Sequence, residues 1–309
     1  MQRIQSDGPI PEALRGASVA LGALDGVHLG HQAVIAAARE AANAKGVMVG
    51  ATCFEPPPKL YFARDKAEPF RLASPTVRAA LCAEVGLDAL FELPFNDAVA
   101  ALTAEQFARD ILQTRLGVSH VTVGFDFQFG RDRTCDGAAL TRYGELYGFG
   151  VTVVPALNDA GGLKVSSTRI REALKAGDIA TANAMLGRPW RVDGVVEHGE
   201  QRGRTIGFPT ANFGLGEQLH PRFGVYAVRA DIGDGVWRPA VANFGRTPTT
   251  GLRAPLLETV LLDWSGDLYD TLLAVEFHAF LRPEMKFDGL AALTHQIAVD
   301  SEAARAVFA

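Results

Sequence analysis

The chain changes its secondary-structure rhythm near residues 186–189, and this change constrains the fold more than any other feature of the sequence. Before that point, short β-rich runs alternate with stretches of helical spacing. Such alternation predicts a parallel sheet covered by helices on both faces. The expected strands are residues 19–21, 47–54, 89–93, 121–125 and 151–154, and the expected helices are residues 32–44, 76–85, 103–116 and 138–147.

Beyond residue 187, strand candidates follow one another with no helix between them, and Gly, Pro and Asp punctuate them. This pattern is typical of an antiparallel barrel or sandwich. The expected strands are residues 192–198, 224–230, 237–243, 256–264 and 272–280. Only residues 290–308 regain helical spacing. The sequence therefore predicts an α/β domain at residues 1–186 and a mostly β domain with a C-terminal helix at residues 187–309.

Composition limits the classes of partner and compartment. A chain of 309 residues is long enough for two domains. Its formal net charge of −5 argues against a nucleic-acid partner. Three scattered cysteines are expected to be reduced thiols, as in a cytoplasmic protein. Neither a signal-peptide core nor an apolar run of membrane-spanning length is evident, so we expect no membrane partner. Oligomeric state is left open.

Two histidines, His28 and His31, follow the first expected strand in the run ALDGVHLGH at residues 23–31. The chain turns through Gly26 and then enters a helix, so both imidazoles lie on one face near the positive end of the helix dipole. Gly30 has no side chain to obstruct an anion, and the first helical N–H groups are free donors. The run predicts a seat for a polyphosphate, and two surface histidines in a Gly-rich turn are the alternative.

A second cluster, VSSTRIR at residues 165–171, follows the fifth expected strand at another helix start. The hydroxyls of Ser167 and Thr168 can cap that helix or bind phosphate oxygens, and Arg171 has a donor fork suited to them. Plain helix capping with an exposed arginine is the alternative. Ligands of parallel sheets bind at the carboxyl ends of the strands. We therefore expect the two clusters to hold one triphosphate from two sides.

The segment GRTIGFPTAN at residues 203–212 joins two expected strands of the second half. Gly203 and Gly207 allow a loop to fold over phosphates. Thr210 and Asn212 place two oxygen ligands on one face of an extended segment, as a hard cation such as Mg²⁺ requires. A Gly/Pro loop that merely enters a strand is the alternative.

The two clusters of the first half resemble the HxGH nucleotidyltransferases. The runs FEP, PFN and GFDFQFG, at residues 54–56, 94–96 and 124–130, narrow the resemblance to the adenylyltransferase module of bacterial FAD synthetases. The resemblance implies a Rossmann-like domain in which His28 and His31 stabilise charge on the α-phosphate of ATP. It also implies that Asp126 and Phe127 border the nucleotide and flavin, with core packing as the alternative for the phenylalanine.

Two positions depart from that family pattern. Ala23-Leu24 stand where the family usually has Asn-Phe, and Pro57 stands where it usually has His. Each lost polar group would cost about 1–3 kcal/mol if it made a charged hydrogen bond. An alternative is therefore a riboflavin kinase whose first domain binds flavin or nucleotide without catalysis. A flavin-binding regulatory or nucleic-acid-interacting protein on the same scaffold is the rival from another class.

The second half resembles the riboflavin kinases, because residues 203–212 match their GxxxGxPTAN motif. The runs GVYA, NFG and FLRPE at residues 224–227, 243–245 and 280–284 continue the resemblance. It implies a riboflavin-kinase-type antiparallel β-barrel in which Glu258 is the base for the 5′-hydroxyl of riboflavin and Asn243 contacts the flavin. An exposed strand residue is the alternative for Glu258. The implied enzyme phosphorylates riboflavin to FMN with ATP and Mg²⁺ and then adenylylates FMN to FAD.

Overall fold

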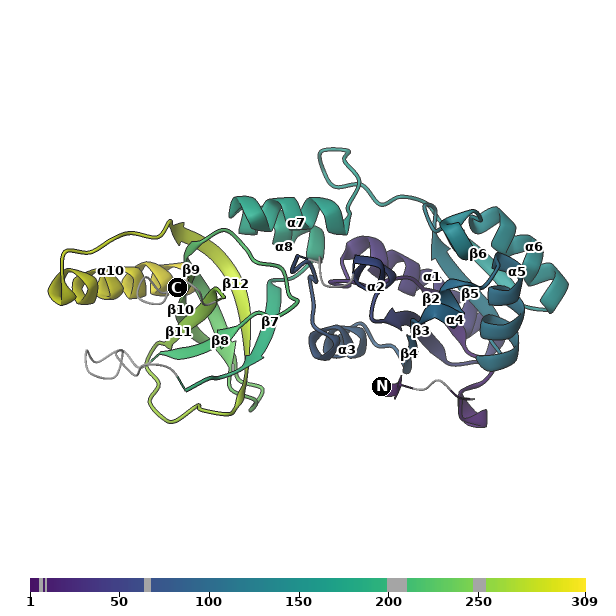
Figure 1. The fold of residues 1–309 in the computed structure, drawn as a ribbon, viewed down its shortest axis with the longest axis horizontal. Helices are drawn as coiled ribbons and strands as arrows, with labels where there is room; N and C mark the ends of the chain where they lie inside the picture. Colours follow the sequence, from purple (N-terminus) through teal and green to yellow (C-terminus); the bar gives the residue numbers. More distant parts are fainter. Residues whose placement is uncertain (6–7, 9, 64–67, 199–209, 247–253) are drawn as a thin grey trace. The chain divides into compact units, whose positions relative to one another are not determined.

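The computed structural model of the chain describes residues 1–5, 8, 10–63, 68–198, 210–246 and 254–309. The chain divides into two compact units, Met1–Ala67 with Arg78–Ser166 and Glu68–Val77 with Ser167–Ala309 (Figure 1). The division falls inside helix α3 (Pro75–Glu84), so a short piece of the N-terminal half belongs to the second unit. The functional boundary that the sequence predicts after residue 186 stays a prediction.

Among the described residues of the first unit, parallel strands form one sheet in the order β1-β4-β3-β2-β5-β6. The order changes direction at β2, which lies between β3 and β5, so β2 ends at the switch point where such sheets bind ligands. The strands are β1 (Gln2–Gln5), β2 (Ser18–Leu21), β3 (Val49–Glu55), β4 (Ala89–Pro94), β5 (His120–Gly124) and β6 (Gly150–Val154). The predicted parallel sheet is confirmed, and the polar edge strand β1 is an addition to it.

Helices and helical turns connect these strands. They are η1 (Glu12–Leu14), α1 (Leu29–Lys45), α2 (Pro58–Ala63), α3, α4 (Asp97–Ala100), α5 (Ala104–Gln106), η3 (Phe107–Arg115), η4 (Arg131–Arg133) and α6 (Gly137–Tyr147). A capping box begins α5, because Thr103 accepts from the N–H of Gln106 and the Gln106 side chain accepts from the N–H of Thr103. The expected helix at 103–116 is present, but η3 is wound as a π-helix.

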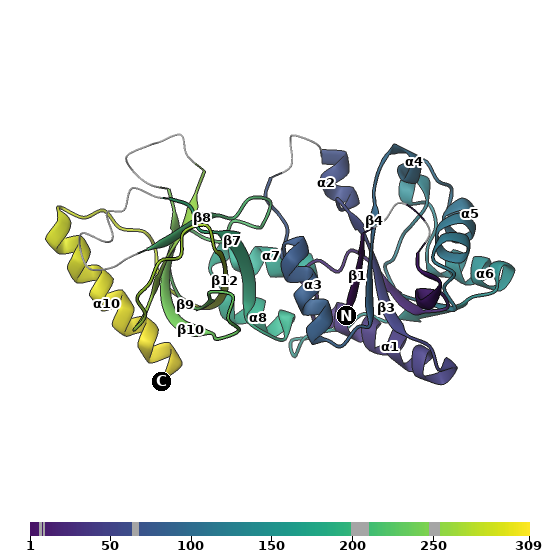
Figure 2. The same ribbon diagram turned by 90° about the horizontal axis from the view of Figure 1, so that it is seen from below.

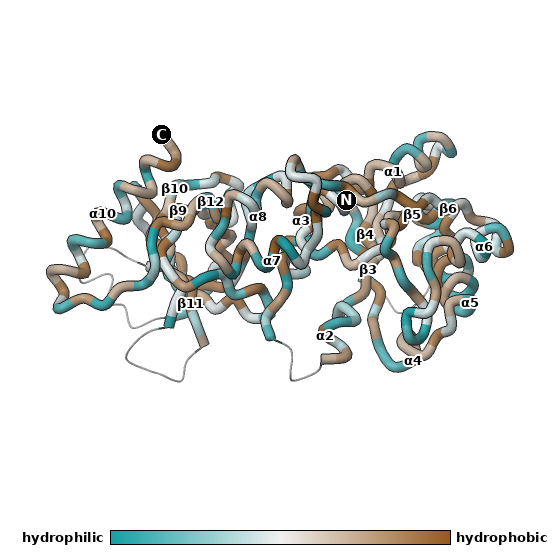
Figure 3. The backbone as a smooth tube through the Cα atoms, turned by 90° about the horizontal axis from the view of Figure 1, so that it is seen from above, coloured by the Kyte–Doolittle hydropathy of each residue, from teal (hydrophilic) through white to brown (hydrophobic). Residues whose placement is uncertain are grey.

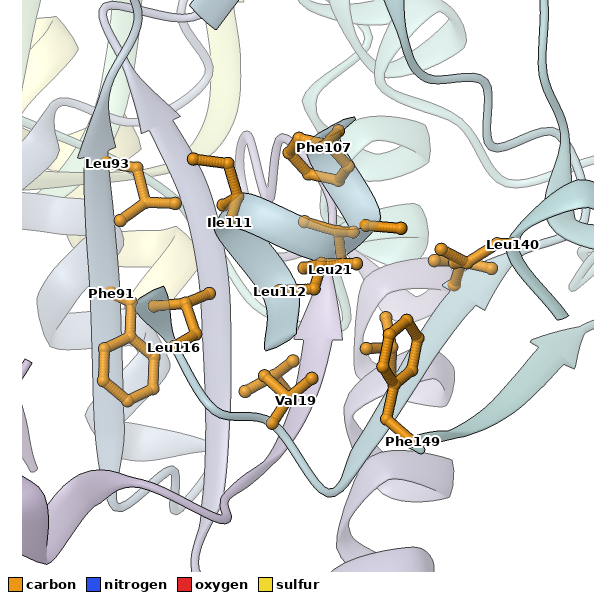
Figure 4. Close-up of a cluster of buried hydrophobic side chains, with 14 of the residues drawn as sticks. Val19, Leu21, Phe91, Leu93, Phe107, Ile111, Leu112, Leu116, Leu140 and Phe149 are labelled. Atoms are coloured by element: carbon orange, nitrogen blue, oxygen red, sulfur yellow. The ribbon is translucent and has the colours of Figure 1, made fainter. Parts of the chain in front are cut away.

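The core of the first unit fills the space between the sheet and the α5–η3 helix. Val19 and Leu21 point to this face of β2, and Figure 4 shows them beside Ile111 and Leu112 of η3. Because side chains alternate along a strand, Ser18 points to the other face, where its hydroxyl donates to the carbonyl of Ala38 in α1. The two helices thus cover opposite faces of the strand that leads into the histidine run.

A buried ion network lies beside this core. Arg78 is 2% exposed and donates to Glu55 at 2.8 Å and to Glu92. Arg3 of β1 also donates to Glu92, at 2.5 Å. Burial alone would raise the pKa of Glu92, but the hydrogen bonds from Arg3 and Arg78 outweigh it and hold that pKa below its usual value. The neighbouring thiol of Cys53 has a pKa raised to about 12 by burial, so it is not a nucleophile.

In the second unit, the described strands are all antiparallel to their neighbours and follow the order β7-β12-β9-β10-β11-β8. They are β7 (Trp190–Val195), β8 (Ala211–Gly214), β9 (Gly224–Asp231), β10 (Arg238–Gly245), β11 (Leu256–Leu261) and β12 (Leu272–Arg282). The sheet nearly closes on itself, because the N–H of Glu197 donates to the carbonyl of Asn212 at 2.8 Å. The predicted antiparallel barrel is confirmed.

Helices flank the barrel. α7 (Ser167–Ala176) and α8 (Ile179–Leu186) precede it, and α10 (Leu290–Phe308) is the predicted C-terminal helix. Figure 2 shows α10 alongside β9 and β10, which it contacts. Hydrophilic and hydrophobic residues alternate along α10 (Figure 3), and Ala304 and Phe308 pack on the apolar sheet face formed by Val225, Val241 and Val260. In the described part of the chain, no helix is both long and apolar enough to cross a membrane.

Closure of the barrel predicts that two glycines differ in how much stability an alanine substitution costs. A Cβ on Gly194 of β7 would lie 2.1 Å from the ring of Phe213 in β8, whereas a Cβ on Gly214 would meet nothing closer than 3.8 Å. We expect Gly194→Ala to lower the free energy of unfolding by about 1–3 kcal/mol, because overpacked cores must shift. Gly214→Ala is the matched control, and urea unfolding measures both. Equal stability of the two variants would contradict the packing of Phe213 on Gly194.

Candidate active sites

The first candidate site lies where β2 leads into α1. His28 is the N-cap of α1, and its Nδ1 accepts the backbone N–H of His31 at 3.3 Å. The two imidazole rings stack with centroids 3.7 Å apart and planes 15° apart. Because Nδ1 is the acceptor, the proton of the neutral His28 ring is on Nε2, where it can be donated to an anion. The structure therefore brings the two predicted histidines together at a helix N-terminus.

The backbone before α1 is held in an unusual conformation. Leu24, Gly26 and Val27 have φ values of 50°, 78° and 40°. Positive φ is costly for a β-branched residue, and such strain concentrates at functional sites. A Cβ on Gly30 would lie 3.1 Å from two atoms of the His28 ring and 3.6 Å from the carbonyl of Val165. The glycine at position 30 thus makes room for the His28 ring itself.

The second predicted cluster lies at the start of α7, in the second unit. Ser167 is the first residue of that helix, and Thr168 follows it. Arg171 donates from Nε to the carbonyl of Phe70 at 2.8 Å, and its guanidinium lies 5.3 Å from the centre of the Phe70 ring. The helix start is thus as expected, and a joint grip with the histidines on one triphosphate stays a prediction.

The run GFDFQFG follows β5 and mixes exposed and packed side chains. Asp126 is exposed and pairs with Lys164 at 2.5 Å. Lys164 also lies 4.6 Å from the ring centre of Phe125. Phe127 is half-buried and stacks on Phe129, with ring centroids 5.6 Å apart. Both of these rings pack against the core of the first unit, whereas Phe125, Asp126 and Gln128 of this run are exposed.

Sequence reasoning missed an aromatic cluster at the carboxyl ends of β3 and β4. The ring of Phe95 lies 5.3 Å from that of Phe54, 5.1 Å from that of Tyr61 and 5.7 Å from that of Phe62. Phe62 is 66% exposed although it is a large apolar side chain. The runs FEP and PFN already marked two of these rings, but nothing in the sequence places the Tyr61-Phe62 pair of α2 beside them.

The second candidate site is a row of polar side chains across the barrel. Glu258 of β11 is paired in register with Asn212 of β8 on one side and with Asn243 of β10 on the other. The amide of Asn243 donates to the Glu258 carboxylate. Burial raises the pKa of Glu258, and the negative charge of Glu284 raises it further. The side-chain oxygen of Asn212 is buried and has no hydrogen-bond partner in the described part of the chain.

The surroundings of this row contain a further carboxylate and a pocket. A Cβ on Gly245 would lie 1.8 Å from Oε1 of Glu284, so that carboxylate lies directly over the glycine. A pocket beside β8 is lined by Thr210, Ala211, Trp264, Asp267 and Tyr269, among others. Thr210 thus lies on the pocket wall, two positions from Asn212. The other predicted residues of the motif, Gly203 and Gly207, lie outside the described residues.

These features define a class of protein. A parallel α/β sheet with paired histidines at a helix start, followed by an antiparallel barrel with a half-buried carboxylate, defines a two-domain transferase of nucleotidyl and phosphoryl groups. The chain matches the FAD synthetase family over residues 10–169 and the riboflavin kinase family over residues 186–308.

Relatives give the particular family. The chain is 44% identical over 296 residues to a bifunctional riboflavin kinase/FMN adenylyltransferase of Pseudomonas fluorescens, with 96% of this chain and 94% of the relative covered. Identity to the protein of the same description from Escherichia coli K12 is 40%, with 95% and 93% covered. The chain belongs to the family of bifunctional riboflavin kinases/FMN adenylyltransferases.

A solved structure extends the likeness to the whole fold. A Streptococcus pneumoniae protein described as a macrolide-efflux protein is 30% identical, and the superposition gives a TM-score of 0.84 with 99% of each chain covered. The efflux description is that of the Streptococcus protein alone. Both transferase domains are present in this chain, so the resemblance and the bifunctional activity predicted from the sequence are confirmed. The names of the relatives favour that activity over a kinase with a non-catalytic first domain.

Proposed function

We propose that residues 187–309 phosphorylate riboflavin with ATP·Mg²⁺, which releases ADP, and that residues 1–186 transfer AMP from a second ATP to the resulting FMN, which gives FAD and releases pyrophosphate. The observation that carries the proposal is the register row of Asn212, Glu258 and Asn243 on one face of the barrel. It gathers a half-buried carboxylate, an amide that orients it and an oxygen without a partner in the described residues. Those are the groups that phosphoryl transfer to a hydroxyl needs.

In the kinase reaction, Glu258 accepts the proton of the riboflavin 5′-hydroxyl as that oxygen attacks the γ-phosphate. Burial strengthens the affinity of this carboxylate for the proton. Asn243 donates to the carboxylate and so fixes its orientation, and Asn243 is also proposed to contact the flavin. The pocket beside Thr210 accommodates the ATP base, since Trp264 and Tyr269 offer aromatic faces for stacking.

The residues present fit a magnesium ion. The oxygen of Asn212 is buried without a protein partner among the described residues, and Thr210 supplies a second oxygen two positions before it. Neutral oxygen donors of this kind suit a hard cation that also binds phosphates. When bound, Mg²⁺ offsets the negative charge of the ATP phosphates. Gly203 and Gly207 are proposed to lie against the same phosphates.

In the adenylyl transfer, no protein nucleophile is required. His28 and His31, at the positive end of α1, stabilise the charge that develops on the α-phosphate. Gly26 and Gly30 shape the turn that presents them, and Ser167, Thr168 and Arg171 hold the remaining phosphates. The exposed ring of Phe62 and its aromatic neighbours offer a flat apolar surface for the flavin ring, and Asp126 and Phe127 are proposed to border it.

The substrates are small molecules, namely riboflavin, FMN and ATP. The acidic balance of the chain disfavours nucleic acid as a partner. Three free cysteines fit a reducing cytoplasm.

The test is to incubate the full-length protein with riboflavin, ATP and Mg²⁺ and to separate the flavins chromatographically over time. We expect FMN first and FAD later, and we expect chelation of Mg²⁺ by EDTA to stop FMN formation. FMN that accumulates without FAD would favour a non-catalytic first domain. Ala23→Asn with Pro57→His would then show whether the two departures from the family pattern are the cause. No FMN at all would overturn the proposal.

A further inference from the structure

A segment of the N-terminal half is built into the kinase unit. Residues 68–77 lie within the stretch that matches the FAD synthetase family, yet they belong to the compact unit that contains the barrel. Arg71, Leu72 and Ala73 are at most 3% exposed there. A surface linker would not be buried to this degree, so these residues are part of the fold of the kinase unit.

Hydrogen bonds anchor this segment on a turn at residues 215–219. The N–H groups of Phe70 and Arg71 donate to the carbonyl of Glu217 at 3.1 and 3.0 Å, and Leu219 N–H donates to the carbonyl of Arg71 at 2.8 Å. The Arg71 guanidinium adds an ion pair to Glu217 at 2.7 Å. The fully buried indole of Trp190 donates to the carbonyl of Leu72 at 2.8 Å.

The same turn is joined on its other side to β7. The Gln218 side chain is buried, and its amide donates to the carbonyl of Asp193 at 2.7 Å while its oxygen accepts the N–H of Asp193 at 3.2 Å. Ser74 hydrogen-bonds to the Asp193 side chain. The turn is therefore held between β7 and residues 70–74 by hydrogen bonds on both sides.

This turn is the continuation of β8, which carries Asn212. β8 is a four-residue strand that is paired with β11 along its length and with Glu197 at one point. Such a short strand has little to hold its position on its own. Residue 215 directly follows β8, so the anchored turn at 215–219 is continuous with the strand that carries Asn212.

We propose that residues 68–74 are a positioning segment of the kinase site, which fixes β8 and the Asn212 oxygen through the turn at 215–219. Arg71 is then a positioning residue for the kinase reaction, although it lies in the FAD synthetase part of the sequence. The inference rests on the proposed function, in which Asn212 holds the Mg²⁺ of ATP.

The test compares two buried arginines seven positions apart in the full-length protein. Arg71→Met removes the ion pair to Glu217 in the kinase unit, and Arg78→Met is the matched control, because Arg78 pairs with Glu55 and Glu92 in the first unit. For Arg71→Met, we expect the Mg²⁺ concentration that half-saturates FMN formation to rise about fivefold or more, since small displacements of a positioned ligand are costly. FAD formation from supplied FMN should stay within about twofold of the unmodified protein. For Arg78→Met we expect the reverse: FAD formation from supplied FMN falls, and the Mg²⁺ concentration that half-saturates FMN formation stays unchanged.

The half-saturation by Mg²⁺ separates positioning from loss of folded protein. A smaller folded fraction lowers the apparent kcat but leaves the half-saturating Mg²⁺ concentration unchanged. An unchanged half-saturating concentration in Arg71→Met would therefore overturn the proposal. Loss of FAD formation alone in that variant would overturn it as well. Glu217→Gln is a milder variant at a half-exposed side chain, and it should shift the Mg²⁺ dependence in the same direction. Arg71→Lys can still pair with Glu217, so it should raise the half-saturating Mg²⁺ concentration less than Arg71→Met does. Asn212→Ala tests the proposed function separately: an unchanged Mg²⁺ dependence there would remove the cation role of Asn212 whatever Arg71 does.

Discussion

Glu258→Gln is expected to abolish FMN formation from riboflavin and to leave FAD formation from supplied FMN intact. Gln keeps the size of the side chain but cannot accept the hydroxyl proton, and loss of a general base costs about 10²–10⁴-fold in rate. The fold should tolerate the change, because burial already disfavours the charged form of Glu258. The two half-reactions are measured on the same preparation by chromatography of the flavins.

A second Glu→Gln substitution separates loss of the general base from a general effect of losing one negative charge. Glu302→Gln makes the same change at an exposed position on α10, and it should leave both half-reactions unaltered. If Glu258→Gln retained more than about a tenth of the FMN formation, Glu258 would not be the base. If it abolished both half-reactions, the division of labour between the two domains would be wrong.

His28→Asn is expected to lower FAD formation from FMN by about 10²–10³-fold, the usual effect of removing one donor to transition-state charge. FMN formation should be unchanged. In the structure, His28 both caps α1 and stacks on His31. Asparagine is also a good N-cap residue, so His28→Asn keeps the cap and removes only the imidazole.

His28→Ala is the comparison that separates catalysis from helix capping. It removes both functions, and loss of the cap should lower the free energy of unfolding by about 0.5–2 kcal/mol, measured by urea unfolding. Both variants should lose FAD formation to a similar extent, since both lack the imidazole. FAD formation that survives in His28→Asn but not in His28→Ala would show that His28 only caps the helix.

Local sequence patterns predicted the parts of the structure that depend on near neighbours. The alternation before residue 186 gave the parallel sheet, and the run at residues 23–31 placed both histidines at the start of α1. The expected helix at residues 103–116 is present as α5 and η3. These features follow from strand and helix periodicity and from capping, which act over a few residues. The winding of η3 as a π-helix was not predicted, since no local signal distinguishes it from an α-helix.

Prediction of the candidate sites needed both the sequence motifs and the tertiary structure. The motif at residues 203–212 singled out Asn212, and the family resemblance singled out Glu258 and Asn243. Only the strand register put the three in one row, because register depends on pairing between segments far apart in the chain. The exposed ring of Phe62 joins its aromatic cluster for the same reason: α2 and the end of β4 meet only in the folded unit.

The sequence by itself determined the two domain types, the histidine pair at a helix start and the identity of the polar residues in the barrel. Only the tertiary structure decided which residues complete each unit. Residues 68–77 read as part of the first domain, yet the fold buries Arg71 and Leu72 against the barrel strands and the turn at 215–219. Burial of a segment depends on the surface that receives it, and that surface is assembled from residues more than a hundred positions away.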